Sequence, residues 1–211
     1  MTWSAPEWAA GVCAGAHAAG CRDVVYVPDN PLSHVLRVFE ARYADVRLIL
    51  ATREEEAFGI AAGLYLGGRR PAVMLQSSGL GNSLNAMTSL LVPYQIPVVM
   101  VVSMRGDEGE WNAAQMPMGR AVRTILDAIW IPHLTAESSG TTSEAVQRAA
   151  AQAFSTRMPH ACLLPTLLTA DARLKGSRYT PEVVARGFEP SETPQDVARG
   201  FQPSGGNDDP S

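Results

Sequence analysis

This sequence lacks a cluster of positive charge. There is no dense stretch of lysine and arginine and no alternation of aromatic with basic residues, and the formal net charge at pH 7 is -4. Proteins that grip a phosphate backbone cluster their positive charge on one face or one segment. Nucleic acid is therefore not an expected partner.

Long apolar runs and cysteine pairs are also missing. No apolar stretch reaches the length of about 18 residues that a membrane helix needs, and the N-terminus has no basic region followed by an apolar one. Cys13, Cys21 and Cys162 are widely spaced and form no CxxC pair. This usage is typical of reduced thiols that fill a core in the cytosol. We expect a cytoplasmic protein with no membrane segment and no metal site built from cysteine or histidine.

The common catalytic signatures are absent as well. The sequence contains no G-x-S-x-G elbow, no Walker lysine motif and no H-E-x-x-H. Hydrolase, P-loop and zinc-protease functions therefore lack support.

What is present is an average globular composition, with 46% hydrophobic and 18% charged residues. We expect one domain over residues 1–169. From about residue 170 large apolar residues become rare, which predicts a disordered tail over 170–211. The tail repeats a short motif, at 184–191 and again at 197–204. A docking motif for a partner would explain the repeat, and slippage in a repetitive coding stretch explains it more simply.

Short apolar runs alternate with helical patterns along the first 164 residues. The predicted strands are 24–27, 47–51, 71–76, 96–103, 130–134 and 161–164. The predicted helices are 6–19, 32–43, 54–67, 82–92, 119–128 and 142–155, with a loop at 105–118. This alternation predicts an α/β fold, an open and mostly parallel sheet with helices on both faces. Ligands of such sheets bind at the carboxyl ends of the strands.

Two segments after predicted strands could carry chemistry. Glu54, Glu55 and Glu56 open a helix rich in alanine and glycine; acidic residues in a first turn are common because they complement the helix dipole. The small residues that follow indicate that something approaches this helix closely. The second segment, 77–82, holds Gly79 and Gly81 around Leu80. It lacks the third glycine of a dinucleotide fingerprint, and an ordinary strand-to-helix turn explains it equally well.

Together, the two segments resemble the pyrimidine-binding domain of thiamine-diphosphate enzymes. That family has a pattern E-x-x-A-x-x-x-A-x-G, followed after the next strand by S-G-x-G-x-x-N. The first pattern is met by Glu54, Ala57, Ala61 and Gly63. Most of the second is matched by Ser78, Gly79, Leu80 and Gly81, with Asn82 or Asn85 in place of the asparagine.

The sequence is also similar to the family of sulfopyruvate decarboxylase alpha subunits and to the matching half of phosphonopyruvate decarboxylases. The similarity runs over about residues 24–125, and the combination of its motifs is more specific than any one of them. The stretches that carry it are 27–29, 53–56, 61–63, 78–86, 105–106 and 115–120.

The resemblance implies thiamine diphosphate as the cofactor and Glu54 as the catalytic residue. In the family this glutamate bonds a ring nitrogen of the aminopyrimidine, which promotes loss of the thiazolium C2 proton. Counting back from Gly63 selects Glu54, although Glu55 remains a possible register. The implied cofactor-binding residues are Glu54, Ser78, Gly79, Leu80, Gly81 and Asn82.

Three further residues are substrate candidates. Asp29 follows the first strand, where decarboxylase relatives place a polar group facing the substrate, and an ordinary turn aspartate would look the same. Arg105 and Gln115 lie in the loop after the most apolar strand. A guanidinium suits a tetrahedral oxyanion such as a sulfonate or phosphonate, and a solvated loop arginine is equally plausible.

The Gly-Asp-Gly motif, with which the family binds the metal and the diphosphate, does not occur in this sequence. The resemblance therefore implies a beta subunit that carries the diphosphate-binding domain and holds Mg²⁺, with a small 2-oxo acid as substrate. The expected function is the alpha subunit of a phosphonopyruvate or sulfopyruvate decarboxylase. The alternatives are another 2-oxo acid decarboxylase, a carboligase related to acetolactate synthase, or a catalytically silent regulatory subunit.

Overall fold

The computed structural model describes residues 4–110 and 112–170. The predicted tail and its repeated motif lie outside the described residues from position 171 on. In the described part, six strands form one sheet in the order β2-β1-β3-β4-β6-β5, and each neighbouring pair is parallel. The strands are β1 (Asp23–Tyr26), β2 (Arg47–Leu50), β3 (Pro71–Gln76), β4 (Val99–Ser103), β5 (His133–Thr135) and β6 (His160–Leu164).

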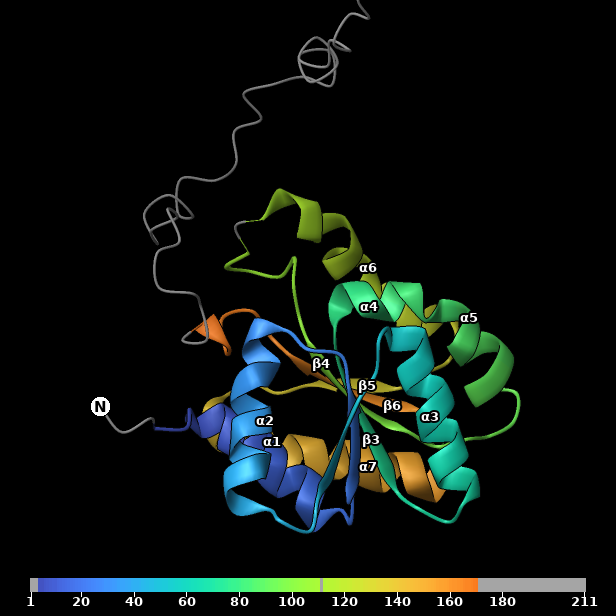
Figure 1. Cartoon of the computed structure of the whole chain (residues 1–211). Coiled ribbons are helices and arrows are strands. Elements are labelled where there is room, and N and C mark those ends of the chain that lie inside the picture. Colours follow the sequence, from blue (N-terminus) through green and yellow to red (C-terminus); the bar gives the residue numbers. More distant parts are fainter. Residues whose placement is uncertain (1–3, 111, 171–211) are drawn as a thin grey trace, which may run out of the picture. The chain divides into compact units, whose positions relative to one another are not determined.

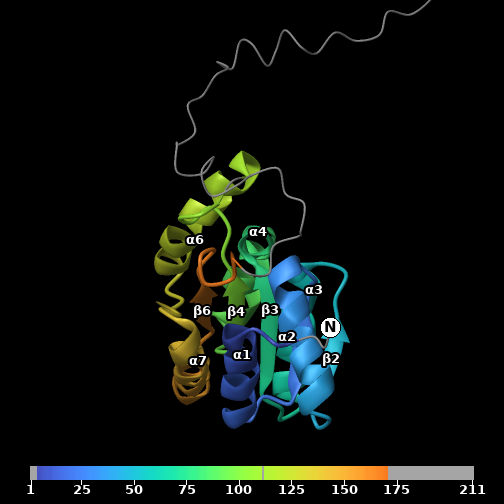
Figure 2. The same cartoon turned by 90° about the vertical axis from the view of Figure 1, so that its left-hand side faces the viewer.

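Helices cover both faces of this sheet (Figures 1 and 2). One face carries α1 (Glu7–Ala18), α2 (Asn30–Arg42) and α7 (Thr142–Thr156). The other carries α3 (Glu54–Leu66), α4 (Ser77–Asn82), α5 (Leu84–Ala86), the π-helix η1 (Met87–Leu91) and α6 (Met116–Ala128). The predicted α/β fold, parallel sheet and two helical layers are confirmed.

Alternation along the central strands divides the core between the two faces. Val24 and Met74 belong to the cluster under α1, α2 and α7. Val25 and Val73 belong to the cluster under α3 and α6. All five residues of β4 are buried, as expected of a central parallel strand covered on both sides. The three cysteines are buried too, which confirms them as core residues.

The segment after β3 differs from its prediction as a turn. Residues 77–82 form the helix α4 directly after the strand, and neither glycine there has a positive φ. Gly79 and Gly81 therefore serve close packing rather than an unusual backbone conformation. The predicted helix over 82–92 is interrupted: the Val92 N–H donates to the Met87 carbonyl, five residues back, which is π-helical spacing.

Two predicted strands are shorter at their starts. β4 begins at Val99 rather than at residue 96, because Pro97 has no N–H to give to a ladder. β5 begins at His133, because Trp130 takes φ 58° and its N–H donates to the Asp127 carbonyl. Trp130 thus belongs to the turn after α6 instead of opening the strand.

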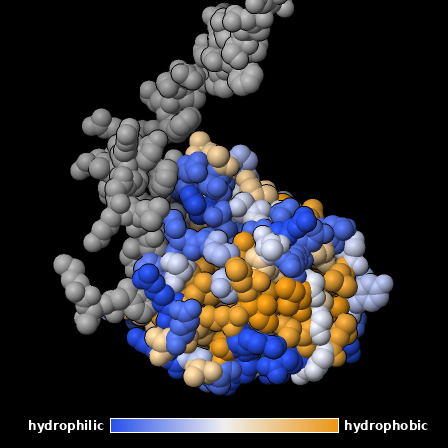
Figure 3. Space-filling model, in the orientation of Figure 1, coloured by the Kyte–Doolittle hydropathy of each residue, from blue (hydrophilic) through white to orange (hydrophobic). Residues whose placement is uncertain are grey.

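Small residues occupy two sides of α3. Ala57, Ala61 and Ala62 are buried against the sheet. Gly59 and Gly63 are exposed, and a Cβ added at either would meet nothing within 4 Å. Figure 3 shows apolar residues gathered on the face where α3 and the edge strand β2 lie in Figure 1. On these elements Leu50 and Leu66 are 62% and 75% exposed.

None of the helices in the described ranges is long and apolar enough to span a membrane.

Candidate active site

The candidate residues lie at the carboxyl ends of four neighbouring strands. Asp29 follows β1, Glu54 opens α3 just after β2, α4 follows β3 without a break, and Arg105 lies two residues beyond β4. Because these strands are parallel, their carboxyl ends meet at one edge of the sheet. Figure 1 shows α4 and the segment leading into α6 at that edge.

Glu54 packs directly on Gly79. A Cβ at Gly79 would lie 2.2 Å from Glu54 Cγ and 2.3 Å from its Cδ and Oε1. No real side chain tolerates such distances, so the half-buried carboxylate occupies space that only glycine leaves open. The Asn82 amide lies at the other side, with Nδ2 3.4 Å from Glu54 Oε2. The two sequence motifs, 25 residues apart at Glu54 and Gly79, therefore meet through one carboxylate.

The three consecutive glutamates have different environments. Glu56 turns back to Thr52, whose backbone N–H and hydroxyl donate to Oε2 at 2.7 and 2.6 Å. Glu56 thus joins the first turn of α3 to Thr52, the residue before the N-cap Arg53. Glu55 is exposed. Of the three, Glu54 is the residue that contacts α4.

The remaining α4 residues occupy different positions. Leu80 is fully buried in the core, so only its backbone lies toward the edge of the sheet. Ser78 is exposed, and its hydroxyl donates to the Gln76 side chain. Gly81 packs against Met118 of α6, whose sulfur would lie 2.6 Å from an added Cβ.

Asp29 is the N-cap of α2 and is joined to β4. Its Oδ1 accepts the Leu32 N–H at 2.7 Å, and its Oδ2 accepts the hydroxyl of Ser103. Burial raises the pKa of Asp29 above its ordinary value, against the opposing effects of these hydrogen bonds and of Arg105. Ser103 was not among the predicted residues; the only signal for it is a polar residue that closes a long apolar run.

Arg105 forms a two-point ion pair with Glu110. Nε and Nη2 donate to Oε2 and Oε1 at 2.6 and 3.0 Å. This hydrogen bonding raises the pKa of Arg105. Burial acts to raise the pKa of Glu110, but the hydrogen bonds from Arg105 and from the Asn112 N–H outweigh it and lower that pKa. Arg105 is also anchored through its backbone N–H, which donates to Ser77 Oγ at 3.0 Å.

The segment after Arg105 folds back on itself, so that Gln115 returns to its side. A Cβ at Gly106, which has φ 73°, would lie 2.7 Å from the Gln115 carbonyl oxygen. A Cβ at Gly119 would lie 1.7 Å from the Arg105 carbonyl oxygen. Glycine is required at both positions. The predicted loop over 105–118 is therefore tightly packed at its base, and its last residues already belong to α6.

Comparison with known proteins agrees with this arrangement. A family model described as "Thiamine pyrophosphate enzyme, N-terminal TPP binding domain" matches residues 8–118, which include Asp29, Glu54, α4 and Arg105. The chain belongs to the thiamine pyrophosphate enzyme family. The family resemblance inferred from the sequence is confirmed.

Several relatives of this thiamine pyrophosphate domain are named decarboxylases. The sulfopyruvate decarboxylase subunit alpha of Methanothermobacter thermautotrophicus is 44% identical over 135 residues, 64% of this chain and 81% of the relative. The protein of the same name from Methanocaldococcus jannaschii is 39% identical over 141 residues, 67% of this chain and 83% of the relative. The phosphonopyruvate decarboxylase of Streptomyces viridochromogenes is 36% identical over 172 residues, 79% of this chain but 42% of the relative.

The site fits one part of the cofactor. The carboxylate of Glu54, pressed on the bare backbone of Gly79 and flanked by Asn82, offers a polar group and a flat surface to an aminopyrimidine ring. The metal ion that accompanies the diphosphate needs several oxygen ligands. In the described ranges no three histidine, cysteine, aspartate or glutamate residues are grouped to hold a metal ion. The arrangement of Glu54, Gly79 and Asn82 therefore fits an aminopyrimidine ring.

Proposed function

We propose that this chain is the alpha subunit of a two-subunit thiamine-diphosphate-dependent decarboxylase that acts on sulfopyruvate or phosphonopyruvate. The observation that carries the proposal is the contact of Glu54 with Gly79, beside Asn82, within a domain of this family. The names of the relatives support a 2-oxo acid as the substrate.

In the proposed reaction the bond between the carboxylate carbon and the carbonyl carbon breaks, and carbon dioxide leaves. The electron pair stays with the carbonyl carbon, where a proton replaces the lost group and the aldehyde forms. When bound, the cofactor supplies the electron sink that this step needs. The task of this chain is to position groups around it.

Glu54 has the central role in this proposal. Its carboxyl group would hydrogen-bond a ring nitrogen of the aminopyrimidine and hold or release a proton at that nitrogen. Gly79 leaves room for this carboxyl group, and Asn82 Nδ2 fixes one of its oxygens. Ser78 and the backbone around Leu80 and Gly81 would line the ring.

The other end of the site would hold the substrate. Arg105 and Gln115, brought together at the base of the 105–119 segment, would face the sulfonate or phosphonate. Asp29, fixed by Leu32 and Ser103, would lie near the reacting carbons.

A beta subunit would complete the site. The sequence contains no Gly-Asp-Gly, and the described residues offer no cluster for a metal. In this proposal the partner subunit holds Mg²⁺ and the diphosphate-binding domain. The subunit names of the archaeal relatives support a heteromer.

The test is carbon dioxide release from sulfopyruvate and from phosphonopyruvate by this chain co-purified with its partner, thiamine diphosphate and Mg²⁺. Glu54→Gln keeps the shape of the side chain but cannot exchange a proton, so kcat should fall by about 10²–10⁴-fold. Glu55→Gln is the matched control: it makes the same change on the exposed neighbour, and its kcat should stay close to that of the wild type.

Two results would contradict the proposal. Equal loss in both variants would remove the special role of Glu54. A folded, cofactor-loaded complex that decarboxylates neither acid would instead indicate another 2-oxo acid, a carboligation or a regulatory subunit.

A further inference from the structure

A buried carboxylate fixes Arg105 at the end of β4. The Glu110 side chain is 1% exposed, and it accepts the Nε and Nη2 protons of Arg105 at 2.6 and 3.0 Å. The Asn112 N–H donates to the same carboxylate at 2.9 Å. A buried, two-point pair of this kind leaves the guanidinium one orientation. Glu110 thus determines which edge of Arg105 is presented.

The edge of Arg105 that remains carries Nη1. A guanidinium has five N–H groups, and Glu110 takes those on the Nε side. Among residues 4–110 and 112–170 no acceptor is bonded to Nη1. The neighbouring carboxylate, Asp29, is near enough to contribute to the raised pKa of Arg105, but its own oxygens accept from Leu32 and Ser103. The Nη1 edge is therefore available to a ligand.

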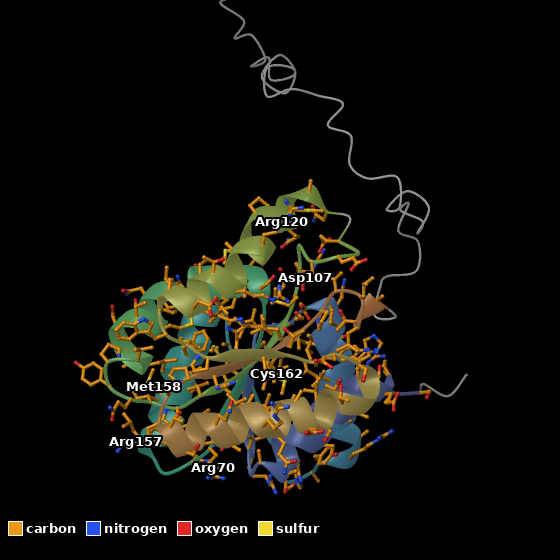
Figure 4. All side chains as sticks on the ribbon, turned by 180° about the vertical axis from the view of Figure 1, so that it is seen from behind. Arg70, Asp107, Arg120, Arg157, Met158 and Cys162 are labelled. Atoms are coloured by element: carbon orange, nitrogen blue, oxygen red, sulfur yellow. The ribbon has the colours of Figure 1, made fainter. Side chains whose placement is uncertain are left out.

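The segment brings little net charge to this position. Glu110 cancels the charge of Arg105, and Asp107 pairs with Arg123 at 2.9 Å in the same segment. Figure 4 shows Asp107 and Arg120 at the same end of the molecule, opposite Arg70 and Arg157. Arg120 is exposed, so solvent and salt screen it. The other charged group shown to act on Arg105, Asp29, is an acid.

A binding site in which a carboxylate neutralises the arginine distinguishes anions by their charge. A sulfonate carries one negative charge, whereas a phosphonate, like a phosphate monoester, carries between one and two near neutral pH. Each additional charge must be brought toward acidic groups without a compensating cation. Both anions have tetrahedral oxygens that fit the arginine edge equally well, so shape does not separate them.

We propose that Glu110 is a positioning and specificity-determining residue, which aims the Nη1 edge of Arg105 at the acid group of the substrate and favours a sulfonate over a phosphonate. The inference rests on the proposed function and adds to it the choice between the two substrates. Glu110 acts through Arg105 and does not itself touch the substrate.

The test compares kcat and KM for sulfopyruvate and phosphonopyruvate in the complete complex. Glu110→Gln removes the cancelling charge and keeps the size of the side chain. It should raise kcat/KM for phosphonopyruvate relative to sulfopyruvate by about tenfold, mainly through KM. Glu110→Asp keeps the charge but withdraws the carboxylate, so KM should rise for both substrates and their ratio should stay the same.

The matched control is Asp107→Asn, which makes the same change of charge in the pair with Arg123. It should leave the ratio of kcat/KM for phosphonopyruvate to kcat/KM for sulfopyruvate near that of the wild type. If Asp107→Asn shifts the ratio as much as Glu110→Gln, net charge alone is responsible and the proposal is overturned. It is also overturned if the wild-type complex is active and Glu110→Gln changes neither ratio nor KM.

A second variant covers the case in which Glu110→Gln does not fold. Arg105→Lys keeps the charge but cannot form the two-point pair, so KM should rise for both substrates with kcat little changed. An unaltered KM would overturn the proposal. A wild-type complex that is inactive on both acids would overturn the proposed function, and this inference with it.

Discussion

At the scale of single residues, the contact of Gly79 with Glu54 leaves no room for a side chain at position 79. Gly79→Ala places a methyl group where Glu54 Cγ, Cδ and Oε1 now lie within 2.3 Å. The helix itself should tolerate alanine, which favours helix over glycine. We expect kcat to fall by roughly 10- to 100-fold as the carboxyl group is displaced, while the midpoint of denaturant unfolding is kept.

Gly67→Ala provides the comparison for Gly79→Ala. Gly67 ends α3 with φ -78°, and its nearest neighbour would lie at an ordinary 3.4 Å from the new Cβ. This variant should retain activity. A fully active Gly79→Ala enzyme would show that Glu54 can move aside without loss, and that its present position is not the working one.

Sequence patterns point to some residues of the candidate site and not to others. Glu54, Gly79 and Asn82 stand in recognisable motifs, and the structure brings them together. Ser103 and Glu110 stand in none. Ser103 reaches Asp29 across 74 positions of the chain, and Glu110 reaches Arg105 within a segment that turns at Gly106, where φ is 73°. Contacts of this kind depend on packing that no local pattern encodes.

At the scale of elements, α3 carries two glycines that the isolated chain does not need. Gly59 and Gly63 lie inside the helix, exposed and without neighbours for a Cβ. Gly59→Ala and Gly63→Ala should each stabilise the isolated chain by about 0.5–1 kcal/mol, because alanine loses less conformational entropy in a helix. Denaturant unfolding of the chain without its partner measures this.

A loss of stability in either alanine variant would mean that the neighbouring side chains close over α3 in solution. Titration of the same variants with the partner subunit shows whether that subunit covers α3. On a covered face the added methyl group should weaken association.

Element types were predicted more reliably than element boundaries. Buried parallel strands were clear because apolar runs such as 71–76 and 161–164 are short and bounded by turn residues. The segment 77–82 was predicted as a turn because its two glycines suggested one. The structure makes it helical because α4 packs between Glu54 and Met118, where glycine is needed for space. Tertiary packing decided the conformation against the local signal.

At the scale of the whole molecule, a buried histidine links folding to pH. His160 is 4% exposed, and its Nε2 has no hydrogen-bond partner among the described residues. Burial, together with the proximity of His133, lowers its pKa from 6.5 to about 4. The unfolded chain takes up this proton near pH 6.5, whereas the folded chain resists it until about pH 4. The contribution of His160 to the free energy of unfolding is therefore fully present above pH 6.5 and is lost as the pH falls toward 4.

The expected loss from this group is about 2 kcal/mol between pH 7.5 and pH 5. His160→Gln removes the titration, so its free energy of unfolding should fall less than that of the wild type over the same interval. Unfolding in denaturant at both pH values gives the two differences. Equal losses in the two proteins would mean that His160 is protonated as readily in the folded chain as in the unfolded one.

The strand order also bears on how the chain folds while it is being synthesised. In the part of the chain that the structure describes, no neighbouring strands are joined by a hairpin: Asp23 pairs with Arg47, 24 positions on (47 minus 23), and Val99 with His160, 61 positions on (160 minus 99). Of the six described strands β6 is the last to be made, yet it lies between β4 and β5. Until it leaves the ribosome, β4 has an open apolar edge, the kind of edge that pairs with other chains. The edge of β4 therefore needs protection from aggregation throughout translation until residues 160–164 have emerged.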